Sequence, residues 1–298
     1  MNTFDTSTPI GFVGLGNMGG PMVRHLCNAG FAMHAWARNP ASIESLKDTP
    51  LHPASSIEEL CKASKVICLN VTRTEDVESL LFRADGIANH AQPGTVIVDF
   101  STIDAGRVKT FAPTLKALHI DYLDSPVSGG AVAAQAATLT IMVGGDRSAY
   151  ERMLPLLHTL GKTVRYVGPH GAGQAIKAAN QMAMCIQLVG IAEAMNYALE
   201  QGADLGVTLE VLQSGLAGSK VLDWAGPHMV EGFARPPSIQ AHLHAKDVNM
   251  VADAARAQGL NLPLLYQTAD ILRQLVENGP ASQDTARVFE VVRAHLKG

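Results

Sequence analysis

The sequence predicts an α/β domain followed by an all-α domain, and three observations support this prediction. Short apolar runs alternate with amphipathic segments through the first half of the 298-residue chain, a pattern typical of a parallel sheet with helices on both faces. A glycine-rich turn follows the first apolar run. Beyond Gly168 the strand signals give way to helical composition. We therefore expect domains of residues 1–169 and 170–298, joined by a long helix.

The expected elements of the first domain follow from the spacing of its apolar residues. The expected strands are residues 10–13, 31–37, 66–70, 95–100, 120–123, 139–143 and 164–167. The expected helices are residues 17–29, a short helix from Pro40, 75–82 and 104–118. Gly30 is a natural stop for the first helix. Pro40 fits the first turn of the second, where a missing amide hydrogen costs nothing.

The second domain begins with residues 173–200, a stretch without proline that is rich in Ala, Met, Ile and Leu. Such an apolar helix is expected to be buried nearly all round. Residues 205–296 are helical in composition, with few strand signals. Together these segments carry more apolar surface than one chain is expected to bury, which favours a homo-oligomer.

Composition and charge exclude several classes of protein. The net charge is −4 and no long Lys/Arg block occurs, so neither nucleic acid nor membrane is expected as a partner. Four scattered cysteines predict neither a disulfide framework nor a zinc site, and we expect them to be buried in a reducing compartment. The first nine residues do not resemble a signal peptide. We expect charged residues to interrupt every apolar stretch of membrane-spanning length, and the protein to be cytoplasmic.

A glycine-rich loop after the first strand predicts a dinucleotide site. The run Gly14-Leu15-Gly16-Asn17-Met18-Gly19 matches Gly-x-Gly-x-x-Gly between an expected strand and an expected helix. The first glycine permits a tight turn, the second lets the backbone approach a pyrophosphate, and the third permits close packing of helix and strand. The helix amino terminus then faces the negative charge. We predict that all six residues contact NAD(P) in a Rossmann-type domain; a glycine turn without a ligand is the alternative.

The end of the second strand distinguishes between the two cofactors. An acidic residue there would bind the ribose 2′-hydroxyl of NAD, but this chain has Arg38. A guanidinium can pair with the 2′-phosphate of NADP, so we favour NADP. If Arg38 is only a solvated surface residue, either cofactor binds.

Residues 124–130 follow another expected strand. The Ser128 hydroxyl and the amides of Gly129 and Gly130 can form a small anion-binding nest. An ordinary glycine-rich turn is the alternative for this segment.

Lys177 lies on the long helix among small apolar residues, with no acidic residue nearby in the sequence. Burying an unpaired ammonium group is costly, so Lys177 either extends to water or lines an active-site cleft. Desolvation in a cleft would lower its pKa, as proton transfer near neutral pH requires. Helical spacing places Asn180 and Gln181 on the same face as Lys177.

Six segments together resemble the β-hydroxyacid dehydrogenase family over residues 10–265. These segments are residues 11–19, 99–103, 124–130, 142–145, 171–181 and 246–247. Several independent motifs in the same order are more specific than one glycine loop. The resemblance implies an NAD(P)-dependent oxidoreductase of small hydroxy acids or semialdehydes, usually a homodimer or homotetramer.

The resemblance also assigns roles to individual positions. Lys177 matches the family's catalytic lysine. The other matches are the substrate-binding residues Ser128, Gly129, Gly130, Asn180, Gln181 and Lys246, and the cofactor-contacting residues Val71, Thr72, Thr102, Lys246 and Asp247. The chain has Val71-Thr72 where the family often has Leu-Pro, which should alter loop rigidity. It has Gln181 where many members have Asn, which leaves the choice of substrate open.

Residues 215–223 are similar to a Gly-Leu-Ala-Gly-Ser segment of the tartronate semialdehyde reductase branch, for which a flexible turn is the alternative. The position of His244 before Lys246 is also similar to that branch. The best single substrate is therefore 2-hydroxy-3-oxopropionate, reduced to glycerate. A 3-hydroxyisobutyrate, threonate or other β-hydroxyacid dehydrogenase, a glyoxylate or succinic semialdehyde reductase, and a non-catalytic NADP-binding scaffold stay open.

The expected mechanism is hydride transfer from the nicotinamide to the aldehyde carbon, with Lys177 protonating the developing alkoxide. The loop of Ser128 to Gly130 and Gln181 would hold the carboxylate. No metal is expected, because the lysine charge polarises the carbonyl group.

Overall fold

The computed structural model describes residues 4–280 and 282–296. The chain divides into two compact units, Met1–Lys177 and Ala178–Gly298. The division falls inside helix α9 (Ala172–Glu200), directly after Lys177. Each unit is described by itself below.

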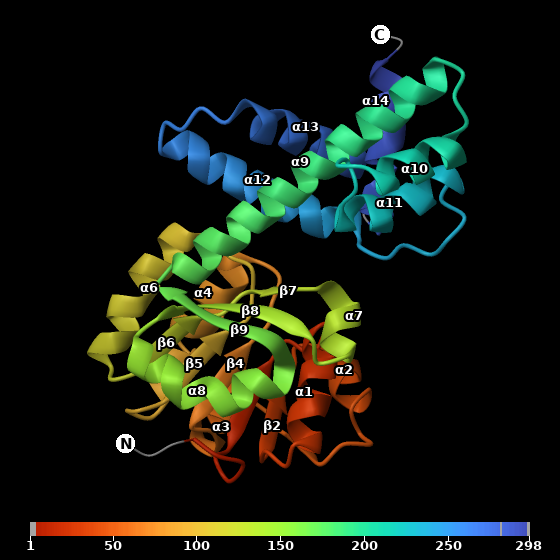
Figure 1. Ribbon diagram of the computed structural model, residues 1–298. Helices are drawn as coiled ribbons and strands as arrows, with labels where there is room; N and C mark the ends of the chain where they lie inside the picture. Colours follow the sequence, from red (N-terminus) through yellow and green to blue (C-terminus); the bar gives the residue numbers. More distant parts are fainter. Residues whose placement is uncertain (1–3, 281, 297–298) are drawn as a thin grey trace. The chain divides into compact units, whose positions relative to one another are not determined.

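The first unit is built on a nine-stranded sheet (Figure 1). The order is β3-β2-β1-β4-β5-β6-β8-β7, with β9 paired to β8. Pairing is parallel except between β6 and β8 and between β7 and β8. The strands are β1 (Ile10–Val13), β2 (Met33–Trp36), β3 (Leu51–Pro53), β4 (Val66–Leu69), β5 (Val96–Asp99), β6 (Asp121–Asp124), β7 (Val127–Ser128), β8 (Leu139–Gly145) and β9 (Gly161–Gly168). All seven expected strands are present, whereas the very short β3 and β7 were not predicted.

Helices cover both faces of this sheet, as the sequence predicts. They are α1 (Gly19–Asn28), α2 (Pro40–Glu44), α3 (Ile57–Ala63), α4 (Thr74–Phe82), α5 (Ile87–His90), α6 (Ala105–Ala117), α7 (Gly130–Gln135) and α8 (Arg147–Leu160). Phe12 and Val98 pack into the core that includes α1 and α8. Val13 and Ile97 pack into the core that includes α3, α4 and α6. Neighbouring strand residues thus enter opposite cores, because side chains alternate across a sheet. The Rossmann-type α/β prediction is confirmed.

The order of the strands predicts where this sheet binds a ligand. Strand β1 pairs with β2 on one side and with β4 on the other. The connections from these strands therefore leave in opposite directions, and open α/β sheets bind their ligands outside the carboxyl ends of the strands at such a point. The glycine-rich loop begins at this end, immediately after Val13.

Helix α9 is partly exposed, so the expectation that it is buried nearly all round was wrong. Lys177 and Gln181 are buried, whereas Ala179 and Ala183 are exposed. Composition alone misled here because Ala serves on either face of a helix. By length and composition α9 could also cross a membrane: an 18-residue window has a mean hydropathy of 1.3, and 33% of it is buried. As expected, charged residues interrupt this helix, because every 18-residue stretch of it includes Lys177 or Glu193. A core helix can have the same length and composition.

The second unit is all-α, as predicted (Figure 1). Beyond its part of α9 it contains α10 (Leu205–Ser214), α11 (Lys220–Val230), α12 (Ala241–Ala257), α13 (Pro263–Glu277), a 3-10 turn (Thr285–Arg287) and α14 (Val288–His295). These helices share one core, to which Leu188, Leu222, Val248 and Leu272 contribute.

All four cysteines are buried and free, as expected. Burial raises the pKa of the Cys61 thiol to about 12. The thiol therefore stays protonated and unreactive at neutral pH.

Candidate active site

The glycine-rich loop has the geometry that a dinucleotide requires. Gly14 has a φ of 97°, and a Cβ there would lie 2.1 Å from the Asn70 carbonyl oxygen. A Cβ on Gly19 would lie 1.9 Å from the Gly14 carbonyl oxygen, so this glycine permits close packing of α1. A Cβ on Gly16 would meet no atom within 4 Å. Gly16 thus borders open space at the amino end of α1, where a pyrophosphate can approach the backbone. The loop fits the cofactor predicted from its sequence.

Arg38 lies between β2 and α2, where the second strand ends. Its neighbour Asn39 caps α2 by accepting a 3.1 Å hydrogen bond from the Ala41 amide. Arg38 is exposed, and within residues 4–280 and 282–296 its side chain makes no hydrogen bond or ion pair. Its guanidinium is therefore available for a ligand phosphate.

The loops after β4 and β5 are joined by a hydrogen bond. The Val71 amide donates to Ser101 Oγ over 2.9 Å. This contact brings the segment of Val71 and Thr72 beside the segment that carries Thr102. The predicted cofactor-contacting positions of these two loops thus lie together, at the carboxyl edge of the parallel strands.

The predicted carboxylate loop joins β7 to α7. Gly129 and Gly130 have φ angles of 125° and 64°, which side-chain-bearing residues rarely adopt. A Cβ on Gly129 would also lie 2.4 Å from Ala133 Cβ. Ser128 precedes them on β7, where it pairs with Thr140. Gly129 is therefore required for this backbone shape and Gly130 favours it, which supports the nest over an arbitrary turn.

Lys177 is buried, with 7% of its surface exposed. It lies in the second turn of α9, one turn after the fully buried Gln174. The prediction of a lysine removed from bulk water agrees with this burial.

Four predicted residues of the second unit form a connected cluster. Gln181 Nε2 donates to Asp247 Oδ2 over 2.7 Å, and Lys246 Nζ lies 2.8 Å from Asp247 Oδ1. Asn180 Nδ2 donates to Gln181 Oε1 over 3.2 Å. Gln181 and Asp247 are buried, whereas Asn180 is exposed. The Asp247 carboxylate thus orients the side chains of both Gln181 and Lys246.

Comparison with known proteins identifies the family. Residues 9–168 match the NAD binding domain of 6-phosphogluconate dehydrogenase, and residues 171–292 match the NAD-binding domain of NADP-dependent 3-hydroxyisobutyrate dehydrogenase. A 2-hydroxy-3-oxopropionate reductase of Escherichia coli K12 is 35% identical over 285 residues, which cover 95% of this chain and 96% of the relative.

Solved structures agree with this match. A 3-hydroxyisobutyrate dehydrogenase of Mycobacterium tuberculosis, solved with L-serine, has a TM-score of 0.89 and 28% identity over 96% of this chain and 99% of its own. Psf3, solved with NADP+ and 2-OPP, has a TM-score of 0.85 and 27% identity over 95% of this chain and 99% of its own.

The chain belongs to the β-hydroxyacid dehydrogenase family. It is an NAD(P)-dependent oxidoreductase of hydroxy acids, and the predicted class of enzyme and cofactor are confirmed. Family members bear the names of different substrates, so membership establishes the type of reaction and leaves the substrate open.

Four buried polar residues of this dehydrogenase were not predicted. Asp99 and Tyr122 lie on β5 and β6, and burial raises the pKa of Asp99 to about 6. Asp124 ends β6, and Gln174 lies in the first turn of α9. Burial raises the pKa of Asp124, against the effect of amide hydrogen bonds from Gly171 and Gln174. The sequence signal was an acid at the end of a strand, but its partners lie far away along the chain.

His244 belongs to a second network that sequence analysis missed. Its Nδ1 lies 3.0 Å from Thr285 Oγ1, and its ring meets Trp224 edge-on. Trp224 Nε1 donates to Ser238 Oγ over 2.6 Å, and that hydroxyl donates to the buried Asp284. The network anchors the start of α12, the helix that carries Lys246 and Asp247.

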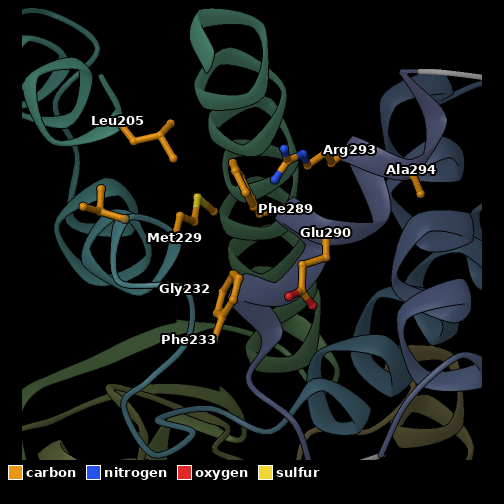
Figure 2. Close-up of a pocket in the computed structure, with 9 residues that line it drawn as sticks. Leu205, Met229, Gly232, Phe233, Phe289, Glu290, Arg293 and Ala294 are labelled. Carbon is orange, nitrogen blue, oxygen red and sulfur yellow. The ribbon is translucent and has the colours of Figure 1, made fainter. Parts of the chain in front are cut away.

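The second unit also contains a cavity of about 540 Å³ away from these residues (Figure 2). Phe233, Phe289, Glu290 and Arg293 are among its lining residues. It contains none of the predicted site residues, so cavity volume alone does not locate the active site. Among residues 4–280 and 282–296, no group of three or more His, Cys, Asp or Glu is placed to hold a metal ion.

Proposed function

We propose that this dehydrogenase reduces 2-hydroxy-3-oxopropionate to glycerate with NADPH, and that Lys177 is its general acid. The observation that carries the proposal is the burial of Lys177 on the face of α9 that also carries Gln181. The 35% identity to a 2-hydroxy-3-oxopropionate reductase and the similar segment at residues 215–223 favour this substrate.

Each proposed residue has one task. When bound, the nicotinamide supplies the hydride that reaches the aldehyde carbon. Lys177 Nζ donates a hydrogen bond to the aldehyde oxygen and passes its proton to the alkoxide that forms there. The amides of Gly129 and Gly130 and the Ser128 hydroxyl bind the substrate carboxylate. Gln181, held by Asp247, presents a fixed amide to the substrate. Positioning of this kind can lower the barrier by several kcal/mol, on the order of 7–11 at best.

We infer a preference for NADPH from Arg38. Its guanidinium follows β2, where NAD-specific domains place an acidic residue, and it has no partner among the described residues. A 2′-phosphate would accept hydrogen bonds from this group.

We also propose that the protein is a homodimer or homotetramer. Tyr197, Val207 and Val211 of the second unit are 67%, 59% and 63% exposed, and Leu216 is fully exposed. Tyr197 lies on α9, Val207 and Val211 on α10, and Leu216 just after α10. Exposed large apolar side chains of this kind are typical of an interface. Light scattering should give at least twice the monomer mass, and Val211→Asp should lower it; a wild-type monomer would contradict the proposal.

A second candidate is oxidation of 3-hydroxyisobutyrate or a related β-hydroxy acid, which the similarity to a 3-hydroxyisobutyrate dehydrogenase favours. Two absorbance assays would distinguish these two candidate functions. The first follows NADPH oxidation with 2-hydroxy-3-oxopropionate, succinic semialdehyde and glyoxylate. The second follows NADP+ reduction with glycerate, 3-hydroxyisobutyrate, threonate and L-serine. We expect kcat/KM for 2-hydroxy-3-oxopropionate to exceed the others by about tenfold or more. No turnover with any substrate, together with tight NADPH binding, would favour a binding scaffold.

A further inference from the structure

We propose that Asp124 and Gln174 are positioning residues that fix Lys177 relative to the loop of Ser101 to Ile103. This inference rests on the proposed function, in which Lys177 donates the proton and that loop contacts the cofactor. Neither residue is assigned a role by resemblance to the family. All the contacts involved lie within the first unit.

Asp124 caps the amino end of α9, although it lies far from this helix in the sequence. Its Oδ1 accepts from the Gly171 amide over 2.9 Å, and its Oδ2 accepts from the Gln174 amide over 3.0 Å. Both carboxylate oxygens thus accept hydrogen bonds from free amides at one helix terminus. The donors lie 47 and 50 residues away along the chain.

Helices α10 and α11 are instead capped by residues close to them in the sequence. Asp204 caps α10 by accepting from the Val207 amide, three residues away, and Ser219 does the same for α11. A local cap stabilises its own helix wherever that helix lies. The cap from Asp124 also fixes α9 to the end of β6, so it determines where the helix begins relative to the sheet.

Gln174 fixes the rotation of the same helix. It is 1% exposed, its Nε2 donates to the Ser101 carbonyl oxygen over 2.8 Å, and its Oε1 accepts from the Ile103 amide over 3.1 Å. The Gln174 side chain thus forms hydrogen bonds with the two residues that flank Thr102. A buried amide that uses donor and acceptor on one loop allows little rotation of α9.

Close packing leaves α9 no room to slide. A Cβ on Gly173 would lie 2.5 Å from the carbonyl oxygens of Asp124 and Met142, and a Cβ on Gly144 would lie 2.6 Å from Asp124 Oδ1. The helix backbone therefore lies directly against β6 and β8 at this point.

These contacts determine the position of Lys177 because it lies one turn after Gln174. A helix advances about 1.5 Å and turns about 100° per residue, so a small shift at Gln174 carries over to Lys177. A displacement of about 1 Å at a reacting group can cost about 100-fold in rate. Loss of either anchor should therefore reduce turnover without removing any group that contacts the substrate.

The test compares Gln174→Met and Asp124→Asn with the control Asp204→Asn. Met keeps the length of Gln but bonds to neither Ser101 nor Ile103, and Asn at position 124 offers one acceptor in place of two. Asp204→Asn makes the same substitution at the local cap of α10, which belongs to the second unit. We expect kcat to fall about 10- to 100-fold in the first two variants, NADPH Kd to change less than about threefold, and the control to keep wild-type kcat.

Hydrogen exchange gives a readout independent of turnover. The amides of Ile103 and Gly171 should exchange faster in Gln174→Met and Asp124→Asn respectively, in proteins with wild-type circular dichroism. Unchanged kcat with faster exchange would overturn the positioning role, and so would a kcat loss no larger than that of Asp204→Asn. If Gln174→Met does not fold, Asp124→Asn decides the question through the same two measurements. Near-normal turnover in Lys177→Ala would instead refute the proposed function and leave the exchange result standing.

Discussion

The Tyr122 hydroxyl donates a 2.6 Å hydrogen bond to Asp99 Oδ2, and both side chains are fully buried between parallel strands. The other carboxylate oxygen accepts from the Ser101 amide over 2.9 Å. Ser101 in turn accepts from Val71 through its hydroxyl. Asp99 therefore anchors the two loops that are proposed to contact the cofactor.

Burial of Asp99 predicts a pH-dependent stability. Its pKa is raised from 3.8 to about 6 in the folded protein, so the folded state binds this proton more tightly than the unfolded state. The stabilisation from this proton is fully present below the unfolded pKa and is lost as the pH rises through the folded pKa. Relative to Asp99→Asn, the wild-type protein should lose up to about 3 kcal/mol of unfolding free energy between about pH 4 and pH 7.

Denaturant titrations of wild-type protein and Asp99→Asn across this pH range measure that difference. Subtracting the two series removes the contribution of the surface carboxylates, whose pKa values are lowered by their partners. A difference that stays constant from about pH 4 to pH 7 would show that Asp99 titrates normally.

Two neighbouring glycines should separate cofactor binding from folding. Gly16→Ala places a methyl group in open space, so the melting temperature should change little while NADPH Kd rises about tenfold or more. Gly14→Ala combines a positive φ with a clash against Asn70, so it should destabilise the fold by about 1–3 kcal/mol or more. Fluorescence titration and thermal melting check both results.

Gly20→Ala is the matched control for these two variants. A Cβ there would meet only the Leu15 carbonyl oxygen, at 3.5 Å, so both affinity and stability should be retained. Equal loss of NADPH affinity in Gly16→Ala and Gly20→Ala would show that the loop does not approach the pyrophosphate.

Arg38→Asp should shift the cofactor preference toward NADH. Replacing a guanidinium by a carboxylate removes the proposed partner of the 2′-phosphate and adds like-charge repulsion. The ratio of kcat/KM for NADPH to that for NADH should fall by about tenfold to 100-fold. Arg24→Asp makes the same change of charge at a surface ion pair with Asp48, and its ratio should equal that of the wild-type protein. An unchanged ratio in Arg38→Asp would remove the role assigned to Arg38.

The local part of this fold could be predicted from the sequence. The glycine loop, the helix stop at Gly30 and the helix start at Pro40 depend on residues adjacent in the chain, and all three are present. Strand β7 could not be predicted, because two residues carry no periodic signal. The antiparallel pairing of β6 with β8 depends on residues far apart in the sequence.

The candidate site likewise divides into residues that local sequence reveals and residues whose partners lie far away along the chain. Lys177 stood out because a charge interrupts an apolar helix, and Gln181 followed from helical spacing. The spacing did not show that Asn180 is exposed while Gln181 is buried, because helical position alone does not reveal what packs against a face. Asp124 and Gln174 bond to partners dozens of residues away, so only the fold reveals them.

Lys177→Ala tests the central claim most directly. Steady-state reduction of 2-hydroxy-3-oxopropionate by NADPH should show kcat lower by about 100- to 10,000-fold, because a general acid contributes an effect of that size. NADPH Kd should stay near the wild-type value, and Lys162→Ala, which removes an exposed lysine from β9, should keep wild-type kcat. A Lys177→Ala variant that reduces the aldehyde at a rate near that of the wild-type protein would contradict the assignment of Lys177 as the proton donor.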